Sequence, residues 1–294
     1  MMAFAGNSLL CRLALKHTGI DAASFTAVRL MSASVTLCLL AGGLRGSWRD
    51  SWRGGGNWPS AFALFAYAAG FSFAYISQPA ATGALLLFGA VQATMIGYGV
   101  WAGERLQPLQ VAGVALALGG LVALVLPGLA APPWGSAALM LGAGVAWGVY
   151  SLRGKGGSGA SNPVAVTAGN FMRTVPFTVV LILLMASQLS LDAAGNGAGV
   201  GYGVLSGALT SGVGYVIWYK VLPALKATHA ATVQLSVPVI AAVGGVVLLG
   251  EPLSLRLGLA SVAILAGIAL VIVKMKAPEP PRANRQGAAA AQDA

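Results

Sequence analysis

The feature that most constrains the fold of this chain is a series of long apolar runs separated by short polar breaks. A helix needs roughly 20 apolar residues to cross the hydrocarbon core of a bilayer, and several of these runs reach that length. Of the 294 residues, 57% are hydrophobic and only 8% are charged, which is too little polar surface to cover a water-soluble globule. The sequence therefore predicts an all-α, polytopic membrane protein.

Ten transmembrane helices are predicted, most of them bounded by glycine, proline or basic residues. Their expected ranges are 2–15, 22–44, 59–77, 80–101, 108–126, 134–152, 163–187, 199–222, 227–249 and 253–273. The first range is shorter than a bilayer requires at the rise of an α-helix. Over 274–294 the composition changes to Pro, Arg, Gln and Ala, which predicts a disordered tail because such a segment has little to bury.

A four-residue pattern occurs twice, as Gly103–Leu106 (Gly-Glu-Arg-Leu) and as Gly250–Leu253 (Gly-Glu-Pro-Leu), and each copy separates two apolar runs. A shift of 147 residues relates the copies, and the same shift brings Gly120 onto Gly267. We interpret this as an internal duplication; the alternative is a chance match, since glycine and leucine are abundant here. The expected division is a first repeat over 1–126, a connection over 127–133 and a second repeat over 134–273.

The basic residues of the loops predict the orientation of the chain. With the N-terminus inside, nearly all loop lysines and arginines lie on the inner side, whereas Lys16 and Arg256 lie on the outer side. Ten crossings then place both termini in the cytoplasm. The two Gly-Glu turns end helices that are five crossings apart, an odd number, so the repeats are expected to enter the membrane in opposite senses. Topology also accounts for the +10 net charge, and nucleic-acid binding is excluded.

Two inverted five-helix repeats suit a transporter. A pseudo-twofold axis in the membrane plane allows two related shapes, one open to each side, with the substrate bound between the repeats near the midplane. The alternative is an old duplication that serves as an intramembrane scaffold without transport. An enzyme is not expected, because the sequence has no H-E-x-x-H, no G-x-S-x-G and no cluster with metal-ligand spacing. Cofactors and metals are likewise not predicted.

The acidic residues bear on energy coupling. All of them are predicted in loops, turns or the tail: Asp21, Asp50, Glu104, Asp192, Glu251, Glu279 and Asp293. A proton-coupled carrier commonly uses an acid embedded in the membrane, so this placement favours a uniporter. His229 is an embedded group that titrates near neutral pH, and it is either a coupling residue or an interfacial histidine without a function.

Three arginines, Arg12, Arg29 and Arg173, fall within predicted spans. They either bind a carboxylate or phosphate, or extend their long side chains to the nearer membrane surface. We expect the second behaviour for Arg12 and Arg29, which lie near the outer edge, and leave both open for Arg173. Glu104 and Glu251 are candidate gating or coupling residues; the alternative, which we favour, is that each accepts hydrogen bonds from the N-terminus of the helix that follows it.

The candidate substrate-binding residues are polar and aromatic side chains within or next to the apolar runs. They are Asn7, Tyr75, Gln78, Gln92, Trp147, Tyr150, Tyr215, Trp218, Tyr219, Gln234 and Pro238. Any one of them could instead bond a neighbouring helix or, for Pro238, bend its own helix. Together they predict a largely apolar chamber with aromatic walls and a few amides. Such a chamber suits a small zwitterion or a neutral molecule with an apolar or aromatic side chain.

Several short segments carry a resemblance to a known family. They are Ala5-Gly6-Asn7, Gly83–Gly89, Trp147-Gly148, Ser236–Pro238 and the two Gly-Glu turns. In these segments, and over residues 3–273 as a whole, the sequence resembles the drug/metabolite transporter superfamily, in its ten-helix branch built from two EamA-type repeats. It departs from the family pattern in two ways: the first helix lacks the usual lead-in residues, and Ala5 stands where a tryptophan is usual.

The resemblance implies a carrier in the bacterial inner membrane that exports small metabolites, with the helices at 108–126 and 253–273 outside a central cavity. The aromatic residues named above favour the branch that exports aromatic amino acids, and we expect a monomer whose partners are a small-molecule substrate and the lipid bilayer. An exporter of toxic or drug-like cations is the alternative. It is less favoured because a cation site usually requires a buried acid.

Overall fold

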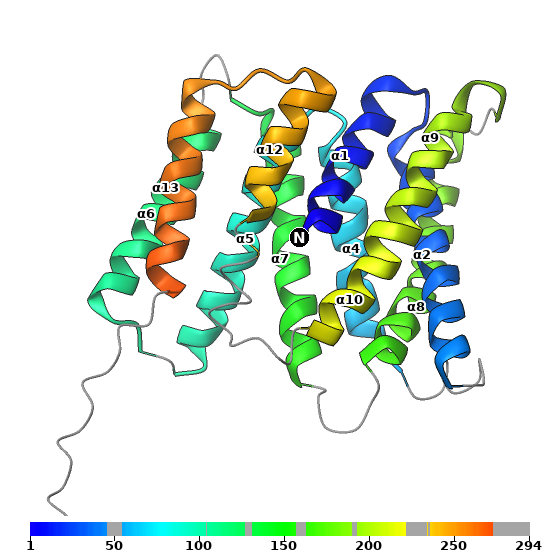
Figure 1. The fold of residues 1–294 in the computed structure, drawn as a ribbon, viewed down its shortest axis with the longest axis horizontal. Coiled ribbons are helices and arrows are strands. Elements are labelled where there is room, and N and C mark those ends of the chain that lie inside the picture. Colours follow the sequence, from blue (N-terminus) through cyan, green and yellow to red (C-terminus); the bar gives the residue numbers. More distant parts are fainter. Residues whose placement is uncertain are drawn as a thin grey trace, which may run out of the picture.

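The computed structural model describes residues 1–45, 55–103, 105–126, 131–156, 163–189, 193–221, 234 and 236–272. Within these residues the chain forms ten helical rods and no strand, which confirms the predicted all-α class (Figure 1). The first five rods are α1 (Met2–His17), α2 (Ala22–Arg45), α4 (Trp58–Ala74), α5 (Ala80–Trp101) and α6 (Pro108–Val125). The second five are α7 (Trp134–Gly156), α8 (Pro163–Leu184), the continuous rod α9–η2–α10 (Ala193–Leu205, Ser206–Val213 and Gly214–Val221), α12 (Ser236–Leu249) and α13 (Leu255–Ile272).

The outer surface of the bundle is apolar. Large side chains such as Leu184, Val247 and Leu255 are 71%, 74% and 80% exposed, which would be unfavourable in water but suits contact with lipid. Six of the described helices are long and apolar enough to cross a membrane, and Ser236–Leu249 and Leu255–Val271 are shorter apolar helices. The chain is therefore a multi-pass membrane protein.

The observed helix ends lie within a few residues of the predicted ones, apart from the start of α9. The predicted loop reached to residue 197, whereas α9 begins at Ala193. The stretch that follows Asp192 contains neither a proline nor a basic residue, so nothing in it stops a helix from starting early. Residues 222–233 and 273–294, which hold the start of the predicted ninth helix and the predicted tail, lie outside the described residues.

The two sets of five helices run in opposite senses. In Figure 1 the α5–α6 turn lies at the bottom edge of the bundle and the α12–α13 turn lies at the top edge. Both turns use a glycine with a left-handed backbone, Gly103 with φ 96° and Gly250 with φ 62°, a conformation that residues with a Cβ rarely adopt. The repeated glycine thus serves the same backbone need twice, at opposite ends of the molecule.

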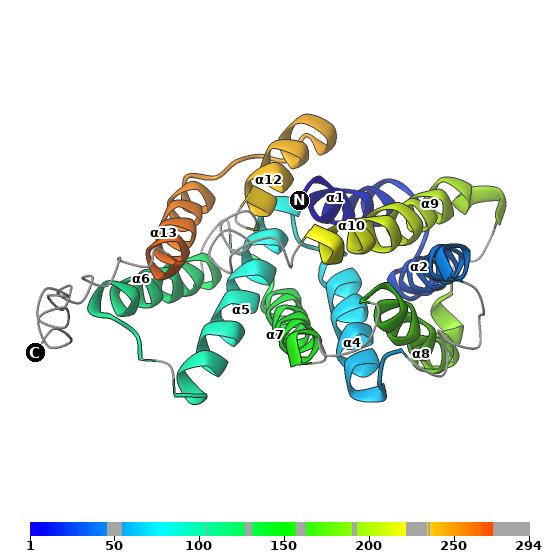
Figure 2. The same ribbon diagram turned by 60° about the horizontal axis from the view of Figure 1, so that its bottom comes forward.

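Each helix of the first set has a counterpart at the same position in the second set, and corresponding helices form corresponding packing pairs. α4 packs on α7 and α9 packs on α1, while α5 packs on α7 and α12 packs on α1. Two further pairs, α2 with α8 and α6 with α13, join a helix to its own counterpart. Figure 2 shows α6 and α13 at one edge of the bundle, apart from α2 and α8 at the other. The two sets are therefore in contact along the whole bundle, from α6 and α13 at one edge to α2 and α8 at the other.

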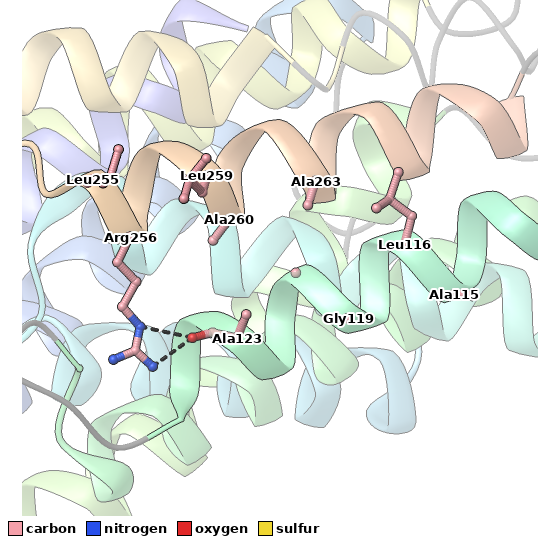
Figure 3. A pocket seen from close by; sticks show the side chains of 10 residues that line it. Ala115, Leu116, Gly119, Ala123, Leu255, Arg256, Leu259, Ala260 and Ala263 are labelled. Atoms are coloured by element: carbon pink, nitrogen blue, oxygen red, sulfur yellow. Dashed lines mark hydrogen bonds between the residues drawn. The ribbon is translucent and has the colours of Figure 1, made fainter.

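The α6–α13 pair is held together by close backbone contact. A Cβ added to Gly267 would lie 2.5 Å from both the amide nitrogen of Ala117 and the carbonyl oxygen of Gly113, so only glycine fits there. Small residues at such a crossing let helices in lipid gain van der Waals contact. Figure 3 shows the outward groove between the same helices, where Arg256 donates hydrogen bonds from Nε and Nη2 to the carbonyl oxygen of Ala123, at 2.9 and 2.6 Å. This cation satisfies the carbonyl end of α6.

Replacing Gly267 should loosen this pair. Gly267→Ala is expected to lower the free energy of unfolding by about 1–3 kcal/mol, because the new methyl group meets backbone atoms that have no room to move. Gly258→Ala on the same helix is the matched control, since nothing lies within 4 Å of its added Cβ. Unfolding of the purified protein in detergent measures both. Equal effects of the two substitutions would contradict the observed packing.

Candidate functional site

A chain of buried polar side chains joins three helices of the first set. The amide nitrogen of Asn7 on α1 donates to the hydroxyl oxygen of Tyr67 on α4 at 3.2 Å. Nη2 of Arg29 on α2 donates to the same oxygen at 3.0 Å. Asn7, Arg29 and Tyr67 are 5%, 2% and 5% exposed. The Tyr67 hydroxyl is therefore the point at which α1, α2 and α4 meet.

Two serines of the second set, both in the segment η2, extend this polar chain. The hydroxyl of Ser206 donates to Oδ1 of Asn7 at 2.6 Å, and the hydroxyl oxygen of Ser211 accepts from Nε of Arg29 at 3.3 Å. Both serines lie in the π-helical stretch Ser206–Val213, a type of distortion that is frequent at functional sites. The polar contacts that η2 makes with the first set thus converge on Asn7 and Arg29.

An aromatic cluster built from both sets borders the polar chain, with Trp147 of α7 at its centre. The ring centroid of Trp147 lies 4.5 Å from that of Tyr67, 5.2 Å from Tyr215, 6.0 Å from Tyr150 and 6.1 Å from Phe4. The tilted and edge-on ring geometries are those that aromatic pairs prefer. The Trp147 cluster therefore connects α1 and α4 of the first set with α7 and α10 of the second.

Other predicted residues lie at the edge of this cluster. Trp218 lies 6.1 Å from the Phe4 ring, and Tyr75 continues the row through Phe71 at 4.7 Å. The Tyr75 hydroxyl donates to the carbonyl oxygen of Ala80. The structure thus brings together six of the predicted residues: Asn7, Tyr75, Trp147, Tyr150, Tyr215 and Trp218.

Three predicted residues are buried elsewhere. Gln78 lies in the α4–α5 turn, where its amide nitrogen donates to the hydroxyl of Ser136 at 3.3 Å. Gln92 is buried on α5 and forms no side-chain hydrogen bond within the described part of the chain. Pro238 is buried near the start of α12. Their positions indicate packing roles rather than membership of the polar chain.

The remaining predictions are tested little by the described residues. Gln234 is helical and half-buried. The side chain of Tyr219 lies outside the described residues, as do Glu104 and His229. Arg173 donates from Nη1 to the carbonyl oxygens of Gly55 and Gly169 at 2.6 and 3.0 Å, so these bonds tie it to backbone between α8 and the start of α4.

An ion pair joins the two sets at the end of the bundle where the α12–α13 turn lies. Nε of Arg12 lies 3.1 Å from Oε1 of Glu251, and Arg12 Nη1 also donates to the carbonyl oxygens of Tyr75 and Ile76. Oε2 of Glu251 accepts from the backbone nitrogen of Ala80 at 2.7 Å. We call this group the Arg12–Glu251 latch. It connects the α12–α13 turn with α1 and with the α4–α5 turn.

The latch corrects two predictions. Glu251 does cap a helix, but the helix is α5 of the first set rather than α13, which follows it in sequence. Arg12 does not reach past the bundle towards the membrane surface, because three oxygen acceptors satisfy it inside. The prediction that Arg29 extends to the surface is also wrong: it is 2% exposed and bonds to Tyr67 and Ser211. Protein partners replace the membrane surface for both arginines.

Comparison with known proteins places this architecture. Residues 134–273 match the sequence pattern of the EamA-like transporter family, and they correspond to the second set of helices. The chain belongs to the EamA-like transporter family. It is thus a membrane transporter of small molecules within the drug/metabolite transporter superfamily.

Two relatives and a solved structure are also similar to this EamA-like transporter. An uncharacterized protein of Pseudomonas aeruginosa is 54% identical over 98% of this chain and 96% of its own. An uncharacterized transporter of Archaeoglobus fulgidus is 30% identical over 58% of this chain and 60% of its own. A solved crystal structure shares the fold, with a TM-score of 0.63 over 92% of this chain and 95% of the other at 22% identity.

Sequence reasoning missed three residues of the candidate site, Tyr67, Ser206 and Ser211, and it missed the inward orientation of Arg29. Tyr67 and both serines lie in apolar runs without any flanking motif, and no residue type signals a π-helical stretch. One signal was available. An arginine inside a predicted span is expensive in hydrocarbon, and such residues usually face the interior of a bundle.

Breaking the Arg12–Glu251 latch should destabilise the transporter. Glu251→Gln is expected to lower the free energy of unfolding by about 2 kcal/mol, because it leaves the partly buried guanidinium of Arg12 without its counter-charge. Arg12→Met combined with Glu251→Gln should lose less than the sum of the two single changes. Lys16→Met, which removes an exposed cation nearby, should change the free energy of unfolding by less than about 1 kcal/mol. Additive losses in a detergent unfolding experiment would contradict the ion pair.

Proposed function

We propose that this EamA-like transporter exports aromatic or other neutral amino acids across the bacterial inner membrane, as a monomer with both termini in the cytoplasm. The observation that supports it is the Trp147 cluster, which is built from both sets of helices and borders the polar chain of Asn7, Tyr67 and Arg29. An apolar side chain would pack on the rings while the zwitterionic end meets the polar chain.

The inverted arrangement supports alternating access as the mechanism. One sequence arranged twice in opposite senses can exchange two similar conformations, each open to one side. The Arg12–Glu251 latch holds the two sets together at one end of the bundle, so opening that end requires the ion pair and the bond to Ala80 to break. In this mechanism the latch gates access at that end, and the substrate binds at the polar side chains of Asn7, Tyr67 and Arg29 and the Trp147 cluster.

We propose that the carrier is a uniporter, whose transport is not coupled to an ion gradient. Among the described residues Glu251 is the one buried carboxylate, and it already has a guanidinium and a backbone amide as partners. A carboxylate with these structural partners is not the unpartnered embedded acid that proton-coupled carriers commonly use. The export of cations is less well supported, because the positive charge of Arg29 lies beside the aromatic cluster.

Flux measurements in proteoliposomes test the proposed function. Liposomes with the purified protein should release labelled tryptophan, phenylalanine or threonine faster than protein-free liposomes. Trp147→Ala should reduce this flux roughly tenfold, since it removes the ring on which both sets converge. Trp134→Ala on the same helix is the matched control, because Trp134 is 61% exposed and should leave the flux unchanged. Absence of protein-dependent flux for all three amino acids would overturn the proposal.

A second measurement in the same liposomes tests uniport. The initial rate of tryptophan release should be the same with and without an imposed pH gradient, and a protonophore should not change it. A rate that needs the gradient and collapses with the protonophore would show proton coupling instead. It would direct attention to Glu104 and His229, the candidate coupling residues outside the described part of the chain.

A further inference from the structure

Arg29 carries a positive charge deep inside the bundle. It lies seven residues after Ala22, the first residue of α2, which is roughly 10 Å along the helix axis. Its side chain turns inward, where the rings of Tyr67 and Phe71 lie 5.2 and 5.0 Å from its guanidinium carbon. The residue is 2% exposed. A charged group at such a place needs a reason, because most charges within a membrane protein mark a site of function.

The charge of Arg29 is not compensated by an acid. Within the residues that the structure describes, the ion pair is that of Arg12 with Glu251, and Arg29 bonds only to neutral hydroxyl groups, those of Tyr67 and Ser211. Its Nη1 atom is buried and has no hydrogen-bond partner. A buried polar group without a partner is rare in proteins, and each case calls for an explanation.

We propose that Arg29 binds the carboxylate of the transported molecule, with Nη1 as the first donor and the Tyr67 hydroxyl as the second. This inference rests on the proposed function and adds to it the group of the substrate that is recognised. The transported molecule carries a carboxylate next to an apolar side chain. In this proposal, Arg29 and Tyr67 recognise the carboxylate of the transported molecule and not its amino group.

The Tyr67 hydroxyl is suited to be the second donor. Its oxygen accepts from both Asn7 and Arg29, so its own hydrogen stays available, and it donates to no other described residue. A phenol hydrogen and a guanidinium hydrogen that lie side by side match the two oxygens of a carboxylate. One guanidinium also balances the single negative charge of a carboxylate, whereas a phosphate dianion would remain half-compensated.

A purely structural role for Arg29 explains less. Its contacts with the rings of Tyr67 and Phe71 are attractive, but the attraction of a cation to two ring faces is smaller than the free energy lost when a guanidinium leaves water. Contact between helices is made by neutral groups elsewhere in the bundle, as by Gln78 in the α4–α5 turn and Ser136 on α7. A bound carboxylate supplies the missing counter-charge.

The position of Tyr67 also indicates where the apolar side chain of the substrate would lie. Tyr67 is part of both groups of residues: its hydroxyl belongs to the polar chain, and its ring lies 4.5 Å from Trp147. A carboxylate held by Arg29 therefore has the Trp147 cluster directly beside it. Carboxylates with an aromatic side chain are expected to bind, and the corresponding amides are not.

Binding to the purified full-length protein tests this inference without relying on flux. Indole-3-propionate carries the carboxylate and the ring but no amino group, and indole-3-propionamide differs from it only at the carboxylate. The acid should raise the unfolding temperature in detergent, and the amide should need at least a tenfold higher concentration for the same rise. Arg29→Gln should abolish the difference between the two. Arg256→Gln, in the outward groove, should keep it.

Each outcome decides the matter. Equal stabilisation by acid and amide, no stabilisation by the acid, or an unchanged preference in Arg29→Gln would overturn the inference. If Arg29→Gln does not fold, Tyr67→Phe replaces it, and the loss of one donor should weaken binding of the acid several-fold but not that of the amide. Absence of amino-acid flux together with acid-specific binding would overturn the proposed function and leave the carboxylate site standing.

Discussion

Inside a bilayer there is no water to satisfy a polar group, and this constraint explains the centre of the molecule. Asn7, Tyr67 and Arg29 are buried among apolar helices, so each has to find partners on its neighbours. They find them on one another and on two serines of η2. Because apolar packing alone does not favour one rotation of a helix in lipid over another, these directional bonds help to fix how α1, α2, α4 and η2 face each other.

The same constraint acts at the end of the bundle where the α12–α13 turn lies. Glu251 and Arg12 satisfy each other's charge, and they also satisfy the first amide of α5 and the carbonyls of Tyr75 and Ile76 in the α4–α5 turn. The latch is therefore an ion pair between the two sets that also caps the N-terminus of α5. At the centre the bonds between the sets are made by neutral serines. The junction between the sets thus contains polar contacts of different kinds, an ion pair at this end of the bundle and serine hydrogen bonds at its centre.

Much of the fold was predictable from the sequence. Apolar runs of bilayer length predicted the helices, and the repeated Gly-Glu turns predicted two sets of opposite sense, which the positions of Gly103 and Gly250 confirm. Asn7 and Trp147 were predicted as site residues because polar and aromatic side chains stand out in an apolar run. Tyr67 and Ser206 were missed, since a helix that is apolar on all sides gives no sign of which face turns inward. The predicted partner of Glu251, the helix that follows it, was wrong. A contact between residues that are far apart in the sequence gives no local sequence signal.

The central claim is that the two sets of helices move against each other around the polar chain and open the end closed by the Arg12–Glu251 latch. Spin labels at His17 at the end of α1 and Leu255 at the start of α13, both exposed, report this most directly through their distance distribution in lipid. The account predicts two distances, with populations that shift when a bound substrate is added. A single distance that stays the same with substrate bound would contradict it.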